Sequence, residues 1–291
     1  MYNLRYHVAS LVAVFLALAV GLLLGTVVAE RGMLTDQSDA LIGDLQKRFD
    51  QLNATNDELS VGLERDRGFI TDVEGLLTVG DLQGADVVLV VGRDSGDEVA
   101  AARKAVEAAG ASVSVLTMRT PDAGLMTAEP EGLAGLLYGS GTEIAPAGEG
   151  LVEQIAAIAA TELAVAGPKP TLDLLAERDV IELRSASETA TADAVVVLAA
   201  DEGPDAFGIA LAAAMLDQGR RAAGAETGVE SDSEELGIAV ACDEAGIPAV
   251  DHLDTPQGRI SLVWILAGRA SGYYGTSERA DAYYPAVPAG D

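Results

Sequence analysis

The stretch "ADVVLVVG", residues 85–92, decides the fold of the larger part of this chain. It is a short, nearly unbroken apolar run rich in valine, which is typical of a strand buried on both faces of a sheet. Residues 95–110 ("SGDEVAAARKAVEAAG") follow with helical spacing, and residues 111–118 ("ASVSVLTM") have the pattern of a second strand. A strand, a helix and a strand in this order predict a parallel pair with the helix packed across it.

The same alternation continues toward the C-terminus. Further strands are expected at residues 179–183, 192–200, 224–230 and 247–253, and helices at residues 131–139, 150–164, 205–219, 234–246 and 255–268. The run at 224–230 is expected at an edge of the sheet. The predicted fold class is therefore α/β, a mostly parallel sheet flanked by helices, preceded by a single N-terminal transmembrane helix and a short coiled-coil stalk.

The transmembrane helix is predicted from residues 8–30, "VASLVAVFLALAVGLLLGTVVAE", where no charge falls between Arg5 and Glu30. As a helix, residues 8–29 measure about 33 Å, enough to cross a hydrocarbon core of about 30 Å. A cleavable signal peptide is the alternative, but its apolar region is typically about 7–15 residues long. We therefore predict a retained anchor in the cell membrane or envelope. Arg5 and the terminal amine on one side, against Arg31 on the other, favour an extracytoplasmic domain.

Small side chains recur at every fourth position of this anchor. They are Ala9, Ala13, Ala17, Gly21, Gly25 and Ala29. Such a ridge lets two helix backbones approach closely, although alanine and glycine are frequent throughout this chain and chance spacing is the alternative. One helix cannot enclose a pore, so the ridge predicts packing against a second copy or a partner.

A coiled-coil stalk is predicted from leucines after the anchor. The expected seam residues are Leu34, Leu41, Leu45, Leu52 and Leu59. The other seam position carries Arg48, Thr55 and Gly62, which predicts modest stability over roughly four heptads. An amphipathic helix packed on the domain is the alternative. The expected partners are thus the membrane and either a second copy or another coiled-coil protein.

The chain is expected to divide into three parts. Residues 1–31 form the anchor, residues 32–80 the stalk and a linker, and residues 81–291 the α/β domain. The linker is expected where glycine interrupts the heptads, at Gly68, Gly75, Gly80 and Gly84.

Composition restricts the partners and the chemistry. The chain has 18 basic and 46 acidic residues and a net charge of −28, which argues against nucleic acid as a partner. We interpret the acidity as compositional bias rather than as a binding surface. Cys242 is the single cysteine, so no intrachain disulfide forms, and its surroundings predict a small buried hydrophobe in a helix.

Motifs for catalysis or cofactor binding are missing. The turn after the first strand, "VVGRDSGDE" (90–98), is neither a dinucleotide fingerprint nor a P-loop, and Ser95 is expected to cap the next helix. The two histidines, one cysteine and five methionines are scattered, with no two within four residues of each other. Because Cu(I) sites cluster such soft ligands, no cofactor or metal site is identifiable, and we predict that the protein is not an enzyme.

The most informative local stretch is "VDHLDTPQGRISLVWILAG", residues 250–268. Thr255 is expected to cap a helix that begins at Pro256. That helix is apolar nearly all round and should be buried, which leaves Arg259 in need of a carboxylate, either Asp251 or Asp254. Asp254, Thr255, Pro256, Gly258 and Arg259 form a motif whose expected role is structural.

The two ends of the chain, "LRYHVASLVAVFLALAVGLLLGT" (4–26) and residues 250–268 followed by "GYYG" and "ADAYYP", resemble the actinobacterial MctB-like copper transport proteins. The resemblance implies a membrane or outer-membrane protein of copper export or homeostasis. It also implies a link of some relatives to cell separation through partners of the stalk. Copper is implied by the resemblance alone. Two functions therefore stay open: a part in copper transport, or a non-enzymatic structural or regulatory envelope protein that acts through its coiled coil.

Overall fold

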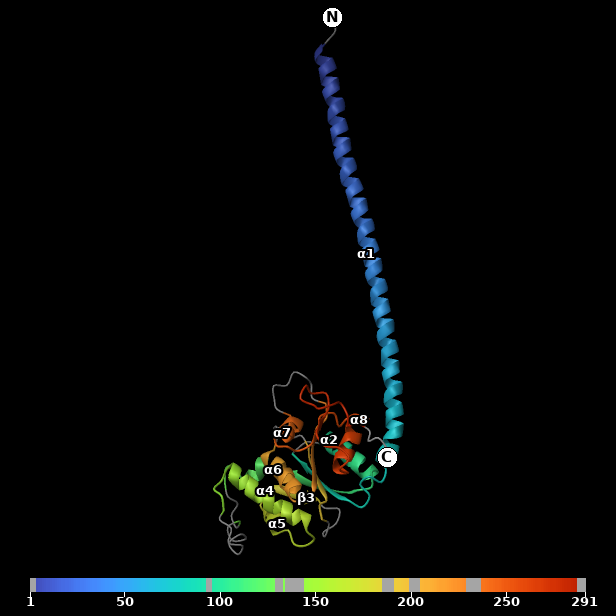
Figure 1. The fold of residues 1–291 in the computed structure, drawn as a ribbon. Helices are drawn as coiled ribbons and strands as arrows, with labels where there is room; N and C mark the ends of the chain where they lie inside the picture. Colours follow the sequence, from blue (N-terminus) through green and yellow to red (C-terminus); the bar gives the residue numbers. More distant parts are fainter. Residues whose placement is uncertain are drawn as a thin grey trace. The chain divides into compact units, whose positions relative to one another are not determined.

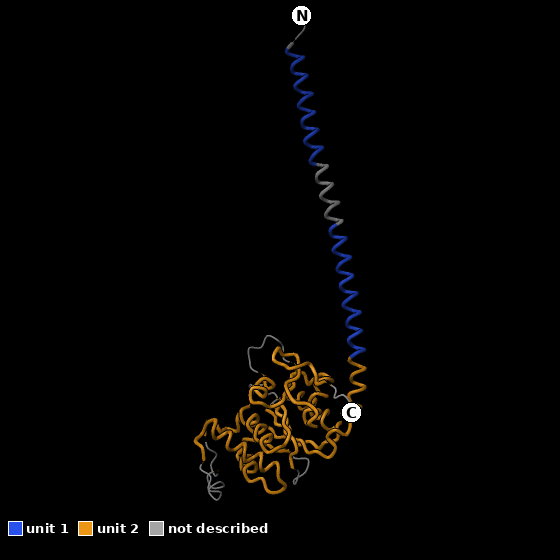
Figure 2. The backbone as a smooth tube through the Cα atoms, in the orientation of Figure 1, with its two compact units in different colours: residues 1–66 blue, residues 67–291 orange. Residues whose placement is uncertain are grey.

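The computed structural model describes residues 4–92, 96–128, 133, 144–184, 191–198, 205–228 and 237–286, with only the backbone for residues 4 and 28–40. The chain separates into two compact units, residues 1–66 and residues 67–291 (Figure 2). The described part of the first unit is helical, and the second unit contains the sheet. The three-part division expected from the sequence stays a prediction.

Helix α1 (Leu4–Thr78) is one continuous helix of 75 residues. No proline occurs before Pro121, so nothing in this stretch removes a backbone donor or forces a kink. The first part of the expected linker is wrong, because Gly68 and Gly75 lie inside the helix. Each costs about 1 kcal/mol relative to alanine, which does not outweigh the helix formers around it.

Seven strands of the described residues form one sheet in the order β3-β2-β1-β4-β5-β6-β7. They are β1 (Asp86–Val91), β2 (Ser112–Met118), β3 (Ile181–Arg184), β4 (Ala194–Leu198), β5 (Arg221–Ala225), β6 (Ala249–Val250) and β7 (Tyr273–Tyr274). Only β3 runs antiparallel to its neighbour, β2, among these pairs. The predicted mostly parallel sheet is confirmed.

Helices cover both faces of this sheet (Figure 1). They are α2 (Gly96–Ala108), the 3-10 turn η1 (Pro121–Gly124), α4 (Glu149–Ala164), α5 (Pro170–Glu177), α6 (Ala206–Asp217), α7 (Ile238–Glu244) and α8 (Pro256–Leu266). Alternate side chains of β1 enter two separate cores. Val88 and Val90 pack with α4, α5, α6 and α7, whereas Val87, Leu89 and Val91 pack with α2 and α8. The central strands are therefore buried on both sides, which explains their continuous valine runs.

One strand differs from the expectation in place and neighbours. The predicted edge strand at 224–230 is wrong, because β5 occupies Arg221–Ala225 and lies between β4 and β6. Its sequence, "RAAGA", lacks the branched residues that signal a central strand. The expected helix at 131–139 lies outside the described residues except for Leu133, and so does Ser95 with the turn around it.

Candidate functional site

Polar side chains gather at the carboxyl ends of β5 and β6, the edge where open α/β sheets bind their ligands. Glu226 follows β5 directly, and Asp251 and His252 follow β6. All three are buried, with 4%, 2% and 2% of their surface exposed. Buried polar groups of this kind need partners inside the protein.

Asp251 holds the C-terminal segment against the sheet. Its carboxylate accepts hydrogen bonds from the hydroxyl of Tyr273 (2.9 Å) and from the amides of Thr276 (2.8 Å) and Ser277 (2.9 Å). Burial by itself raises the pKa of Asp251, but contact with His252 and these donors outweighs it and keeps the pKa below its usual value. The carboxylate therefore acts as an anion that organises residues 273–277.

His252 is buried without a completed hydrogen bond at either ring nitrogen. Its Nδ1 lies 3.4 Å from Oδ1 of Asp251, and its ring faces that of Tyr283 at a centroid distance of 4.6 Å. The tyrosine comes from the C-terminal segment, so the ring is covered by residues far along the chain. The sequence gives little indication that His252 is buried, because burial is predicted from the spacing of apolar residues and a single histidine adds nothing to such a pattern.

Glu226 accepts a hydrogen bond from the amide of Ile238 at the start of α7, at 2.8 Å. Burial raises the pKa of Glu226 to about 7, the main-chain donors of α7 oppose that rise, and Asp251 adds to it. The acid is therefore half protonated near neutral pH, unlike the ionised Asp251 beside it.

The raised pKa of Glu226 predicts a pH dependence of stability. The folded protein holds this proton more tightly than the unfolded chain, so the contribution of Glu226 to stability is fully present below about pH 4.5 and is lost as the pH rises through about 7. The loss is at most about 3 kcal/mol. Denaturant unfolding at about pH 5 and about pH 8 should show a smaller difference for Glu226→Gln than for the native chain. Equal differences would contradict the prediction.

Cys242 lies in α7 and is fully buried, which confirms the expected small hydrophobe in a helix. A β-carbon at Gly224 of β5 would come within 2.5 Å of its sulfur, so the strand and the helix touch directly. Burial raises the pKa of the thiol to about 12, and Glu226 adds to the rise. The thiol is therefore unreactive at neutral pH.

The C-terminal motif begins as the sequence predicts. The Thr255 side chain accepts a hydrogen bond from the amide of Gly258 at 3.1 Å, and Pro256 is the first residue of α8. Gly258 is required by close packing, since a β-carbon there would overlap the carbonyl of His252. The motif thus fixes where α8 begins, close to the carboxyl end of β6.

The expected partner of Arg259 is wrong. Its guanidinium forms a bidentate ion pair with Glu74 near the end of α1, with Nε–Oε1 and Nη2–Oε2 both at 2.7 Å. Asp254 contributes its main-chain carbonyl at 2.9 Å, while its carboxylate accepts from the amide of Gly228. Asp251 is already occupied by the C-terminal segment. Glu74 lies 185 residues away, beyond the reach of local pattern reasoning.

Two further bonds tie the end of α1 and the following turn to the C-terminal end of α8. The indole of Trp264 donates to the carbonyl of Leu77 at 3.3 Å. Arg269, just after α8, pairs with Asp81 at 2.7 Å. Residues 67–81 are therefore an integral part of the sheet domain.

The strand order reverses between β1 and β4, which is where doubly wound sheets bind nucleotides. Two acids lie near this point. Asp122 and Asp205 exchange hydrogen bonds with each other's backbone segments, from Asp122 N (2.9 Å) and from Ala206 N (2.7 Å). Burial raises the pKa of Asp205, with Asp122 adding to the rise. This acidic pair does not favour a phosphate group.

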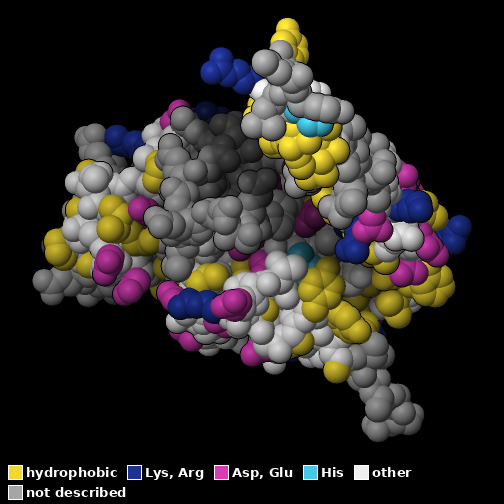
Figure 3. Space-filling view, turned by 90° about the horizontal axis from the view of Figure 1, so that it is seen from above, with side chains coloured by type: hydrophobic (Ala, Val, Ile, Leu, Met, Phe, Trp, Pro, Cys, Tyr) yellow, Lys and Arg dark blue, Asp and Glu magenta, His cyan; other side chains and the backbone are white. Residues whose placement is uncertain are grey.

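Metal ligands do not converge in the described part of the chain. No group of three histidine, cysteine, aspartate or glutamate residues there is placed to hold an ion. Met118 and Met215 lie in the hydrophobic core, and Met126 is 39% exposed. Acidic and basic side chains are interspersed over the visible surface rather than gathered by sign (Figure 3).

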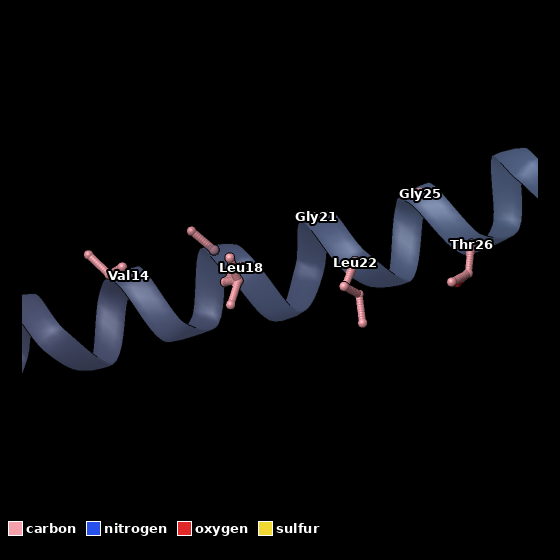
Figure 4. Close-up of a pocket in the computed structure, with 7 residues that line it drawn as sticks. Val14, Leu18, Gly21, Leu22, Gly25 and Thr26 are labelled. Carbon is pink, nitrogen blue, oxygen red and sulfur yellow. The ribbon is translucent and has the colours of Figure 1, made fainter.

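The anchor is a bare helix in this structure. Arg5–Val27, 23 residues, is long and apolar enough to cross a membrane, and none of it is buried. A shallow depression runs along one face, lined by Val14, Ala17, Leu18, Gly21, Leu22, Gly25 and Thr26, and Figure 4 labels all of these except Ala17. A β-carbon at Gly21 or Gly25 would meet nothing within 4 Å. Packing within the described chain therefore gives no reason for glycine at these positions.

The other residues predicted to pack are either exposed or have side chains outside the described residues. Of the small ridge, Ala9, Ala13 and Ala17 are exposed with Gly21 and Gly25, and the side chain of Ala29 lies outside the described residues. Leu41, Leu45, Leu52 and Leu59 of the predicted seam are exposed, and the side chain of Leu34 is not described. Both the ridge and the seam stay predictions.

Comparison with known protein families matches residues 1–285 to "Copper transport outer membrane protein, MctB". The chain belongs to the MctB family. "Copper transporter MctB" of Mycobacterium bovis is 28% identical over 314 aligned positions, which cover 96% of this chain and 98% of the relative. The proteins of that name from Mycobacterium tuberculosis strains CDC 1551 and H37Rv give the same values. No solved structure matches.

Membership of the MctB family confirms the resemblance seen at the two ends of the chain. The family description names a copper transport protein and no known class of enzyme. This description and the helix Arg5–Val27, the one candidate membrane span among the described residues, together indicate a membrane or envelope protein. The structure places the two family-like ends differently: the first is the exposed anchor, and the second packs on Glu74 and the β6 end.

Proposed function

We propose that this protein takes part in copper export or copper homeostasis at the cell envelope, as an oligomer or with a partner protein. The observation that carries the proposal is the match of residues 1–285 to the copper transport family, together with relatives named copper transporters over nearly their whole length. Copper enters here as the transported ion and not as a resident cofactor.

The need for assembly follows from the single anchor. An ion path through a membrane has to be enclosed by protein on all sides, and one helix of 23 residues cannot enclose it. The described residues also offer no converging group of ligands within one chain. A second copy or a partner would supply both, and the ridge from Ala9 to Gly25 is a surface suited to close helix packing.

The domain is proposed to lie outside the cytoplasm. Arg5 precedes the anchor together with the terminal amine, and Arg31 is the nearest positive charge after it. Positive charge favours the cytoplasmic side. Protease added to intact spheroplasts should then digest the sheet domain, and full protection of the domain would contradict this orientation.

A structural or regulatory role, as a cell-separation scaffold that acts through the stalk, is the second candidate. The bidentate contact of Glu74 with Arg259 favours it, because this contact ties the end of α1 to α8, which packs on one face of the sheet.

Deletion of the gene separates the two candidates. Under the copper proposal, deleted cells should stop growing at lower copper concentrations than the parent, and the full chain should restore growth. A chain without residues 4–27 should not restore it, because it lacks the anchor. Unchanged copper tolerance with a defect in cell separation would overturn the copper proposal in favour of the scaffold.

A further inference from the structure

The stalk carries a more complete apolar stripe than its leucines alone indicate. Starting from Leu45, the next apolar residue on the same side is four positions on, at Phe49, and the alternation of three and four continues. The stripe comprises Ile42, Leu45, Phe49, Leu52, Asn56, Leu59 and Leu63, and we call it the 42–63 seam. This is the 3-4 spacing of a two-position heptad seam.

The apolar side chains of the 42–63 seam all project into solvent in this structure. Their exposed fractions are nearly uniform: Ile42 60%, Leu45 57%, Phe49 63%, Leu52 68%, Leu59 61% and Leu63 60%. Scattered exposed apolar residues are ordinary, but a continuous stripe of this length is typical of an interaction surface. The seam ends at Asp66, where an acid takes the next heptad position.

Charge is distributed to leave both flanks of the seam free of acids. The flanking positions are Leu41, Gln46, Arg48, Asn53, Thr55, Ser60 and Gly62. The acids of this segment lie on the outer side of the helix, at Asp44, Asp50, Asp57 and Glu58. In a chain of net charge −28, two such flanks can meet without repulsion between carboxylates.

We propose that the 42–63 seam binds a second copy of this chain as a parallel, in-register, two-stranded coiled coil. Leucine occupies one heptad position throughout, at Leu45, Leu52 and Leu59, and leucine there is typical of two-stranded parallel coils. Asn56 occupies the other position, and a single asparagine at that position specifies register and strand number at a cost in stability. The carboxamide pairs only with its counterpart when the two chains are aligned.

The anchor supplies the direction. Two copies inserted in the same membrane with Arg5 on the same side run parallel, and the seam begins 15 residues after Val27 in each. Both copies therefore present Asn56 at the same distance from their anchors. A parallel coil needs this alignment, and an antiparallel coil is incompatible with it.

The 42–63 seam differs in heptad phase from the seam predicted for the stalk. Counting three residues from each leucine reaches Arg48, Thr55 and Gly62, which lie on a flank, whereas counting four reaches Phe49, Asn56 and Leu63. Leu45, Leu52 and Leu59 keep their place at the center. Leu41 moves to the flank, and Leu34 has the same heptad position.

Cysteine cross-linking of the full chain in membranes tests the proposal. Cys242 is buried and its thiol is unreactive, so the native chain supplies the background. Under mild oxidation Leu52→Cys should form a disulfide-linked dimer. Ala54→Cys, on the outer side of the same turn, should form about tenfold less, because a disulfide needs α-carbons within about 7 Å.

Register is tested by co-expressing Leu45→Cys and Leu52→Cys on chains of two different lengths. In-register pairing predicts that each variant links only to its own kind. A mixed 45–52 product would overturn the in-register coil, because it requires a slip of one heptad. No dimer at Leu52, equal dimer at Leu52 and Ala54, or a product with a different protein would each overturn pairing with a second copy.

The inference rests on the oligomeric part of the proposed function and does not depend on copper. The three substituted residues, Leu45, Leu52 and Ala54, all lie on exposed helix surface, so the sheet domain is expected to fold in every variant. Seam-specific dimers in cells whose copper tolerance does not need the gene would remove the copper proposal alone. Copper tolerance that needs the gene, without seam-specific dimers, would remove this inference alone.

Discussion

Replacing Arg259 with alanine is expected to lower the free energy of unfolding of the sheet domain by about 3–5 kcal/mol. The pair with Glu74 is bidentate and mostly buried, with 11% of the arginine side chain and 16% of the glutamate side chain exposed. Removing the arginine leaves a partly buried carboxylate without its counter-charge, and the carbonyl of Asp254 loses its donor. Breaking one side of such a pair costs far more than the pair itself contributes.

Denaturant unfolding of the full chain in detergent measures this loss. Trp264 is the single tryptophan, and its indole binds the carbonyl of Leu77, so its fluorescence reports whether the end of α1 remains attached. Arg103→Ala is the matched control, because its pair with Glu107 is 3.3 Å long and 40–50% exposed. The control should lose less than about 1 kcal/mol. Equal losses in the two variants would contradict the buried attachment.

Replacing Asp251 with alanine is expected to cost about 3–6 kcal/mol, since it leaves the Tyr273 hydroxyl and the amides of Thr276 and Ser277 without their acceptor. The hydroxyl is buried and the two amides are partly buried, and an unsatisfied buried group costs about 1–3 kcal/mol. The segment from Tyr273 onward should also loosen. Gly275 packs so closely on this carboxylate that a β-carbon there would overlap it.

Hydrogen exchange combined with denaturant unfolding measures the Asp251 effect. In Asp251→Ala the amides of Thr276 and Ser277 should exchange faster, while those of central strand β1 lose only the global stability. Asp254→Ala is the matched control, because its carboxylate accepts one bond, from the exposed amide of Gly228 at 3.1 Å. Unchanged exchange at Thr276 would show that Asp251 does not hold this segment.

The fold class could be predicted because the sheet is buried on both sides. The side chains from Val87 to Val91 pack alternately into two cores, so every position of the strand has to be apolar. The strand therefore appears in the sequence as a continuous apolar run. The position of strand β5 was not predicted correctly because Gly224 makes room for Cys242, and such close packing needs small residues in place of branched ones. Small residues carry no strand signal of their own.

The stalk was harder to delimit because glycine is a weak helix breaker. Gly68 and Gly75 predicted a linker, yet the helix continues to Thr78, and its last turns are held by Glu74 and by the carbonyl of Leu77. Tertiary contact there outweighs intrinsic propensity. No local pattern could reveal that contact, since its partners on α8 are 185 and 187 residues away.

The candidate site was only partly predictable for the same reason. Thr255, Pro256 and Gly258 act within a few residues of each other, so their roles follow from helix-start rules. Asp251 and His252 take their roles from Tyr273 and Tyr283, which return to the sheet from the end of the chain. Long-range burial of this kind has no periodic signature.

The copper content of cells is the measurement that tests the central claim most directly. Cells without the gene, grown in copper, should retain more copper than the parent, and the full chain should return the content to the parental level. A chain without residues 4–27 should leave it high. Equal copper content in parent and deleted cells would contradict a role in copper export or homeostasis.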